Sequence, residues 1–216
     1  MDEHNLAFSL LSLGYKDYIA SRFLINNNYL LQGVTLASSA VEKYFKVILA
    51  LNGKTKREMG VHLDRLDKLK TLLIECYTDI TIHLDERFLE VLGKAYQARY
   101  YDNLTQPITI SFFINQLLGE LDFTINFIEN LITLKTPNGE PFKTPYKRAI
   151  DENVLDLYFN NYILQKIPKK EFMEAVDNGF AVYIDYNNNI KEFEVQGTNI
   201  RNRYDGTIWE INLEFK

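Results

Sequence analysis

The chain has 216 residues, of which 46% are hydrophobic and 25% are charged, and its formal net charge is −5. These values are typical of an ordinary globular protein that buries one sizeable core. The acidic balance argues against a basic face for long nucleic acids, and a single cysteine excludes an intrachain disulfide. Because the sequence shows no basic leader followed by an apolar run, we expect a cytoplasmic protein that spans no membrane.

Apolar residues recur at helical spacing in the first two-thirds of the chain. The pattern predicts helices at about 6–26, 29–51, 62–77, 85–101 and 107–132. In the second helix, apolar residues form one stripe, Glu42 can meet Lys46 one turn later, and Asn52-Gly53 suits a left-handed C-terminal cap. Five helices joined by short loops predict an antiparallel five-helix bundle over residues 1–136.

A proline-rich segment follows the predicted bundle and predicts a linker at 137–149. Residues 150–216 then form a small α+β module in this prediction. It begins with a helix at 151–164 and a short one opened by Pro168. Alternating apolar and polar residues near Phe180, Lys191 and Trp209 predict a three-stranded antiparallel sheet. The predicted fold class is therefore α+β.

Two motifs occur in order on this helical pattern. The first is Glu42-Lys43-Tyr44-Phe45-Lys46, which is followed by His62 and a leucine-spaced helix. The second is Tyr96-Gln97-Ala98-Arg99-Tyr100-Tyr101-Asp102. Together they resemble the HEPN domain, a family of helical bundles. The resemblance covers residues 6–134 and implies the bundle fold, whereas residues 146–216 resemble no family.

Many HEPN proteins are metal-independent ribonucleases in which an arginine and a histidine shortly after it lie near a dimer interface. The histidine moves a proton of the ribose hydroxyl, and the arginine stabilises the charge growing on phosphate. Arg99 matches the arginine, but Leu104, Thr105 and Gln106 occupy the positions for the histidine. No confident catalytic residue follows, and the sequence favours a protein without this catalysis.

The resemblance also implies nucleotide or phosphate binding. The candidate ligand-binding residues are Lys43, Lys46, His62, Arg99, Tyr100 and Asp102. They would supply phosphate donors and a stacking ring. Ordinary structural roles remain open for all of them: paired surface charges for the lysines, a helix cap or core hydrogen bond for His62, a clamp on Asp102 or a neighbouring helix for Arg99, and core or interface packing for Tyr100. We expect no cofactor and no metal, because no glycine-rich loop or metal-ligand spacing occurs.

Three functions stay open at this point. The favoured one is a non-catalytic binding or regulatory protein that engages a nucleotide, RNA or a protein partner. The second is a ribonuclease of the toxin or defence type that uses Arg99 with a non-standard base. The third is a dimeric scaffold that recruits a partner through the C-terminal sheet. The resemblance further implies a homodimer and a nucleotidyltransferase-type protein partner.

Overall fold

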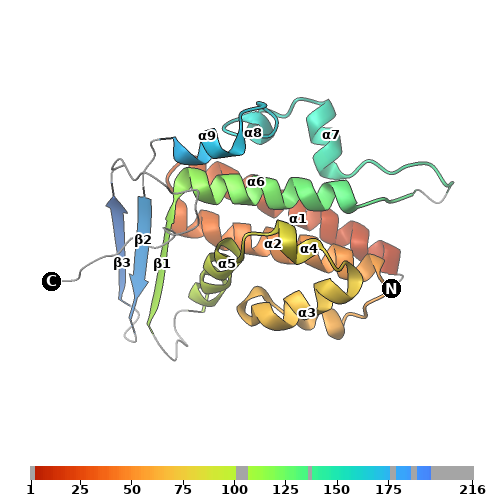
Figure 1. Cartoon of the computed structure of the whole chain (residues 1–216), viewed down its shortest axis with the longest axis horizontal. Coiled ribbons are helices and arrows are strands. Elements are labelled where there is room, and N and C mark those ends of the chain that lie inside the picture. Colours follow the sequence, from red (N-terminus) through yellow and green to blue (C-terminus); the bar gives the residue numbers. More distant parts are fainter. Residues whose placement is uncertain (1–2, 101–106, 136–137, 176–178, 186–188, 196–216) are drawn as a thin grey trace.

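The structure is a computed structural model that describes residues 3–100, 107–135, 138–175, 179–185 and 189–195. Within these ranges the chain combines helices with one three-stranded antiparallel sheet (Figure 1). The elements are α1 (Glu3–Asn26), α2 (Leu30–Leu51), α3 (Leu66–Cys76), α4 (Ile80–His83), α5 (Glu86–Ala98), β1 (Ile108–Phe113), α6 (Ile114–Leu131), α7 (Pro145–Asp151), α8 (Leu155–Tyr158), α9 (Lys169–Glu174), β2 (Gly179–Ile184) and β3 (Ile190–Val195). Two short 3-10 turns, at Glu58–Gly60 and Leu63–Arg65, separate α2 from α3. No helix in the described ranges is long and apolar enough to cross a bilayer.

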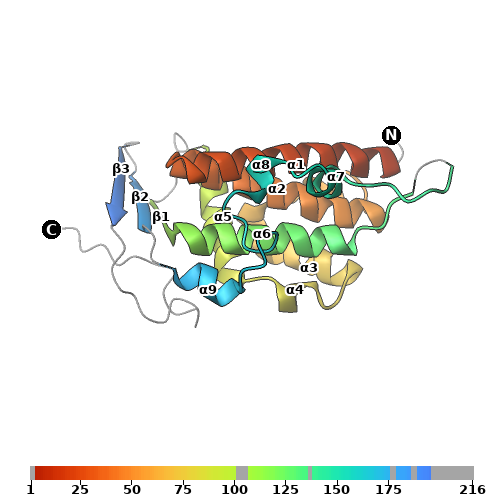
Figure 2. The ribbon, with the colours of Figure 1, turned by 90° about the horizontal axis from the view of Figure 1, so that it is seen from above.

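Helices α1 and α2 form a closely packed pair. A Cβ atom on Gly33 would lie 2.5 Å from Ile25 Cγ1, so only glycine permits this approach of α2 to α1. The predicted end of α2 is confirmed, since Gly53 has a φ of 76° and the Lys54 amide donates to the Leu49 carbonyl at 3.0 Å. The two helices run beside α6 along the helical part of the molecule, and the sheet lies beyond one end of it (Figures 1 and 2).

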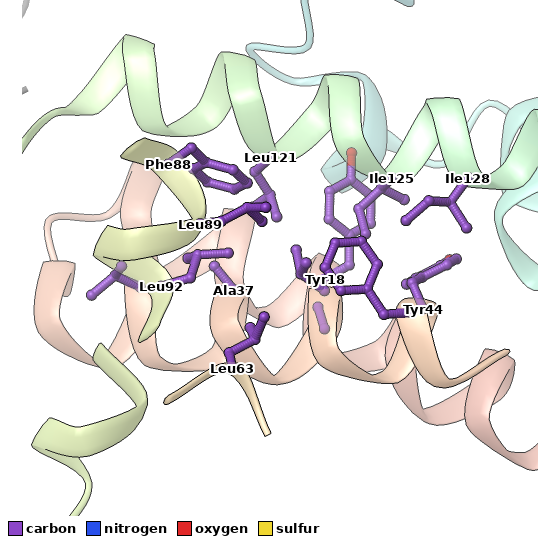
Figure 3. Packing of buried hydrophobic residues seen from close by; sticks show 14 of the residues in the cluster. Tyr18, Ala37, Tyr44, Leu63, Phe88, Leu89, Leu92, Leu121, Ile125 and Ile128 are labelled. Atoms are coloured by element: carbon purple, nitrogen blue, oxygen red, sulfur yellow. The ribbon is translucent and has the colours of Figure 1, made fainter. Parts of the chain in front are cut away.

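The core lies between α1, α2, α5 and α6, and the turn at Leu63 closes one side of it (Figure 3). The predicted apolar stripe of α2 is confirmed. Its buried members are Val34, Ala37, Val41, Tyr44 and Ile48, and only the terminal Leu51 is partly exposed. Leu89 and Leu92 of α5 lie in this core, as do Leu121 and Ile125 of α6. A core shared by four helices fixes the positions of the helix ends that build the candidate site.

The predicted fifth helix is wrong in its first part, because Ile108–Phe113 is strand β1 and the helix α6 begins at Ile114. The segment reads Ile-Thr-Ile-Ser-Phe-Phe, which is rich in β-branched and aromatic residues. It pairs antiparallel with β2, so that Ile110 lies opposite Val182 and Phe112 opposite Phe180. Ile110 and Phe113 also fit a helical stripe in the sequence. In the strand these two residues lie on opposite faces, and both are buried because both faces of this part of β1 are covered.

The sheet has the strand order β1-β2-β3. The predicted pairing of the two strands near Phe180 and Lys191 is confirmed by the antiparallel β2 and β3. The predicted strand at Trp209 lies outside the described residues. Since β1 comes from the part of the chain assigned to the bundle, the sheet joins segments on both sides of the expected 137–149 linker. The division into two domains at that linker stays a prediction.

The predicted single helix at 151–164 is wrong. Helix α7 already begins at Pro145, inside the expected linker, and Thr144 caps it by accepting a hydrogen bond from the Lys147 amide at 3.2 Å. Proline suits the first position of a helix, where its missing N–H is not needed. Asn153, with a φ of 52°, separates α7 from the short α8. The short helix predicted after Pro168 is confirmed as α9.

Candidate functional site

Four side chains from two predicted motifs meet around the ring of Tyr96. The imidazole of His62 stacks on it, with ring centroids 5.0 Å apart and planes 20° apart. The guanidinium carbon of Arg99 lies 5.3 Å from the same ring centroid, and the Tyr100 ring lies at 5.9 Å with a tilt of 60°. We refer to His62, Tyr96, Arg99 and Tyr100 as the Tyr96 cluster. The structure thus brings together three of the predicted site residues.

The end of α5 presents three members of the cluster. Tyr96 lies three and four positions before Arg99 and Tyr100, so all three project from one side of a helical turn. The start of α5 is fixed by Asp85, whose carboxylate accepts a hydrogen bond from the Phe88 amide at 2.8 Å.

His62 reaches Tyr96 because the turn after it packs closely on α5. Leu63, next to His62, is 1% exposed and belongs to the core. A Cβ atom on Gly93 would lie 3.0 Å from the Leu63 carbonyl oxygen. Gly93 lies one helical turn before Tyr96 on α5. Because it has no side chain, it leaves room for the backbone at Leu63. The sequence did not single out Gly93, because nothing in it shows which segment lies against α5.

Helix α2 supports His62 with a carboxylate. Glu42 Oε1 lies 3.0 Å from His62 Nδ1 and 2.7 Å from Lys46 Nζ. The Glu42 side chain is 11% exposed, whereas that of His62 is 42% exposed. The predicted Glu42–Lys46 pair is confirmed. His62 directly precedes the 3-10 turn Leu63–Arg65 and makes no cap bond. Its hydrogen bond joins it to Glu42 of α2 at the edge of the core, since the His62 side chain is partly exposed, so neither the cap nor a hydrogen bond within the core is observed.

Arg99 differs from the two lysines in its partners. Its guanidinium donates a hydrogen bond to the hydroxyl of Ser39 on α2, and it pairs with no carboxylate in the described part of the chain. Lys43 instead pairs with Asp17 of α1 at 2.5 Å. Lys43 and Lys46 are both paired, which is one of the roles left open for them, and Arg99 contacts a neighbouring helix, which is one of the roles left open for it. Asp102 lies outside the described residues.

Solvent reaches one side of the Tyr96 cluster. Arg99 is exposed, Tyr100 is 54% exposed and Tyr96 is half-buried. A surface with a cation that pairs with no carboxylate among the described residues, an exposed phenol ring and a carboxylate-bound imidazole can bind an anion beside a flat ring system. Ser39, Glu42 and Tyr96 were missed as site residues. Glu42 and Tyr96 belong to the two motifs, which is the signal that could have found them, whereas no motif includes Ser39.

A second group of polar side chains is closed off from solvent. Arg22 of α1 pairs with Asp122 Oδ1 of α6, and both side chains are 0% exposed. Tyr18 donates its hydroxyl proton to the same oxygen at 2.7 Å. Burial raises the pKa of Asp122, and burial together with the Asp122 charge raises that of Tyr18. We refer to Tyr18, Arg22 and Asp122 as the buried cluster. Because solvent is excluded, it holds α1 to α6 and is no ligand site.

A further buried carboxylate joins α2, α6 and the start of α7. Glu129 accepts hydrogen bonds from the Tyr44 hydroxyl at 2.9 Å and from the Thr144 hydroxyl at 2.6 Å. Burial raises the pKa of Glu129, and the two hydrogen bonds oppose this rise. Both oxygens are thus satisfied within the fold. This arrangement fixes the segment that precedes α7 and presents nothing to a ligand.

The described residues include no group of three or more His, Cys, Asp or Glu side chains placed to hold a metal ion. Comparison of the chain with protein-family models, with curated proteins and with solved structures found no match.

Proposed function

We propose that the chain is a HEPN-like binding protein whose Tyr96 cluster engages a nucleotide or a short RNA segment. The observation that carries the proposal is the meeting of His62, Arg99 and Tyr100 on the Tyr96 ring. The motifs that suggested the family lie far apart in the sequence, and their side chains are neighbours in space. A five-helix bundle of α1, α2, α3, α5 and α6 belongs to the same proposal, as do a homodimer and a nucleotidyltransferase-type partner.

The chemistry of the cluster suits phosphate and a base. Arg99 offers a planar guanidinium that can donate two parallel hydrogen bonds to phosphate oxygens. Tyr100, 54% exposed, offers a ring face on which a base can stack, a contact worth about 1–3 kcal/mol for each base. The sequence-based absence of a histidine at 104–106 supports binding without the family's usual catalysis.

Equilibrium binding tests the proposal. Fluorescence anisotropy with labelled short RNA, and calorimetry with nucleoside monophosphates, should show saturable binding that weakens about tenfold or more in Arg99→Ala and Tyr100→Ala. Arg87→Ala is the matched control, because Arg87 is an exposed arginine near the other end of α5. Absence of saturable binding to all of these ligands, or equal loss in the control, would reject the proposal.

Ribonuclease activity is the second candidate, favoured by the contact between Glu42 and His62 at 3.0 Å. A carboxylate that holds one imidazole nitrogen orients the ring for proton transfer at the other nitrogen. His62 would then accept the proton of a ribose 2′-hydroxyl while the 2′-oxygen attacks the neighbouring phosphorus and Arg99 stabilises the phosphate charge. The bond from phosphorus to the 5′-oxygen breaks, and the leaving oxygen takes a proton from the imidazolium or from water. In this arrangement His62 takes the place of the histidine that positions 104–106 lack.

Cleavage of RNA by the pure protein in the presence of a metal chelator tests this candidate. We expect His62→Ala and Arg99→Ala to abolish cleavage and His83→Ala to leave it unchanged, since His83 contacts Phe127 and not the Tyr96 cluster. Equal cleavage by all variants would identify a contaminating nuclease. Binding without cleavage would leave the non-catalytic function as the better account.

A further inference from the structure

Large apolar side chains gather on one surface formed by α1 and α8. Phe23 on α1 is 53% exposed, and Leu155 and Phe159 at α8 are 76% and 59% exposed. Ile19, one turn before Phe23, is partly exposed. Figure 2 shows α8 lying against α1. We refer to Ile19, Phe23, Leu155 and Phe159 as the α1/α8 face. A concentration of exposed apolar groups of this kind marks a surface that another molecule covers.

An open groove follows α1 through this face. It extends from Lys16 to Leu24, is lined by Ile19 and Ala20 between them, and meets Asp156 of α8 at its edge. Side chains that protrude, such as Leu155, therefore stand next to a hollow with an apolar lining. A surface with both features can receive a copy of itself.

The buried cluster holds this face rigid. Arg22 donates to the carbonyl oxygen of Phe159, and Asn161 Nδ2 donates to the Tyr18 hydroxyl at 3.4 Å. Asn160 Nδ2 also donates to Asn26 Oδ1 at 3.1 Å. The end of α8 is thus fixed to α1 from below. Little conformational entropy would be lost when a partner covers the face.

The charges at the groove complement one another across the two helices. Lys16 and Asp156 are both exposed and line the same groove, yet neither forms an ion pair within the described ranges. Burial, followed by the negative charges of Asp156 and Glu152, raises the pKa of Tyr15 beside the groove. A cation therefore lies on the α1 side, and acidic groups lie on the α8 side. In a two-fold contact the α1 side of one molecule can meet the α8 side of the other.

We propose that a second copy of this chain docks on the α1/α8 face, with the groove of each molecule covered by the face of the other and Lys16 of each opposite Asp156 of the other. The resemblance to HEPN proteins implies pairing beside Arg99, so that two chains build one site. No member of the Tyr96 cluster lines the groove. The proposed contact is therefore centred on residues other than the Tyr96 cluster. It takes the place of pairing beside Arg99 as the contact of the homodimer, and it does not depend on the proposed ligand.

The oligomeric state of the full chain tests the proposal. Sedimentation equilibrium over a wide concentration range should show a dimer, and Leu155→Asp should weaken it by about a hundredfold. Ile82→Asp is the matched control, because Ile82 on α4 is also 76% exposed. A monomer at every concentration would overturn the proposal, and so would a dimer that Leu155→Asp leaves intact.

A charge exchange tests the pairing without removing apolar surface. Lys16→Glu and Asp156→Lys should each weaken the dimer by about tenfold, and the double variant should restore it. Failure of the double variant to recover would overturn the assigned contact. Arg99→Ala should leave the dimer unchanged, which separates failure of this proposal from failure of the binding function.

Discussion

The Tyr96 cluster and the buried cluster share one arrangement, an arginine beside a tyrosine ring. In each, an arginine lies over a tyrosine ring, at 5.3 Å for Arg99 and Tyr96 and at 5.7 Å for Arg22 and Tyr18. Arg22 is fully buried and its charge is met by Asp122, whereas Arg99 is exposed and meets a hydroxyl. The difference in burial therefore distinguishes the roles of the two arginines. The enclosed arginine holds α1 to α6, and the exposed one is the group that we propose to bind a ligand.

The buried cluster is incompletely hydrogen-bonded. Arg22 Nε and Asp122 Oδ2 have no hydrogen-bond partner in the described part of the chain. A buried polar atom without a partner costs about 1–3 kcal/mol, so this cluster tolerates little further loss. The Tyr96 cluster lies at the surface, where water can satisfy its polar groups. Removing one side chain should therefore lower the free energy of unfolding more in the buried cluster than in the Tyr96 cluster.

The largest expected effect follows from removing one member of the buried ion pair. Asp122→Ala should lower the free energy of unfolding by about 3–5 kcal/mol, because Arg22 would keep a buried charge without its partner. Denaturant titration measures this. The control is Asp151→Ala, which breaks the exposed Lys143–Asp151 pair at 2.6 Å and should cost about 0–1 kcal/mol. A similar loss of unfolding free energy in both variants would show that burial does not set the cost of breaking these ion pairs.

The sequence could not reveal the buried cluster. Arg22 and Asp122 stand 100 positions apart, and a charged residue on a predicted helix is ordinarily assigned to solvent. Only the packing of α1 against α6 shows that both lie inside. Strand β1 was missed for a related reason, because its pairing with β2 overrides an apolar spacing that also fits a helix. Long helices with a clear stripe, such as α2, were predictable since their signal is local.

The candidate site was predictable only in part. His62, Arg99 and Tyr100 were found through motifs, but the residues that position them were not. Tyr96 and Gly93 act through contacts between α5 and the turn after His62, which are distant in sequence. Such contacts leave no periodic pattern. This gives Gly93 a testable role as a positioning residue.

An added methyl group at Gly93 should separate the two halves of the Tyr96 cluster. Its carbon would lie 3.0 Å from the Leu63 carbonyl oxygen, so Gly93→Ala should lower the free energy of unfolding by about 1–3 kcal/mol and shift His62 off Tyr96. Imidazole proton shifts in NMR spectra report the ring stacking. Gly60→Ala is the control, because nothing lies within 4 Å of its added carbon. Unchanged His62 shifts in Gly93→Ala would contradict the assigned role.

The pH dependence of stability should reflect the buried carboxylates. Burial raises the pKa of Glu129 above its ordinary value of 4.5, so the folded state binds that proton more tightly than the unfolded state. The free energy of unfolding should therefore fall as pH rises from about the ordinary to the raised pKa, by at most about 1.4 kcal/mol per pH unit for each such group. Glu129→Gln should make this decline shallower, and the exposed Glu90→Gln should not. Equal slopes would show that Glu129 is not the source.

The smallest effect on stability is expected at Arg99. This variant separates a binding role from a structural role most directly. Arg99 is exposed and contacts only the Ser39 hydroxyl and the Tyr96 ring among the described groups, so Arg99→Ala should change the free energy of unfolding by no more than about 0.5 kcal/mol. The same variant should lose binding of nucleotide or RNA, whereas Asp122→Ala, tested under conditions in which it remains folded, should retain it. Paired denaturation and binding measurements on both variants separate the two roles. If Arg99→Ala were as unstable as Asp122→Ala, Arg99 would have a structural role, and the exposure of its charge would no longer be an argument for a ligand site.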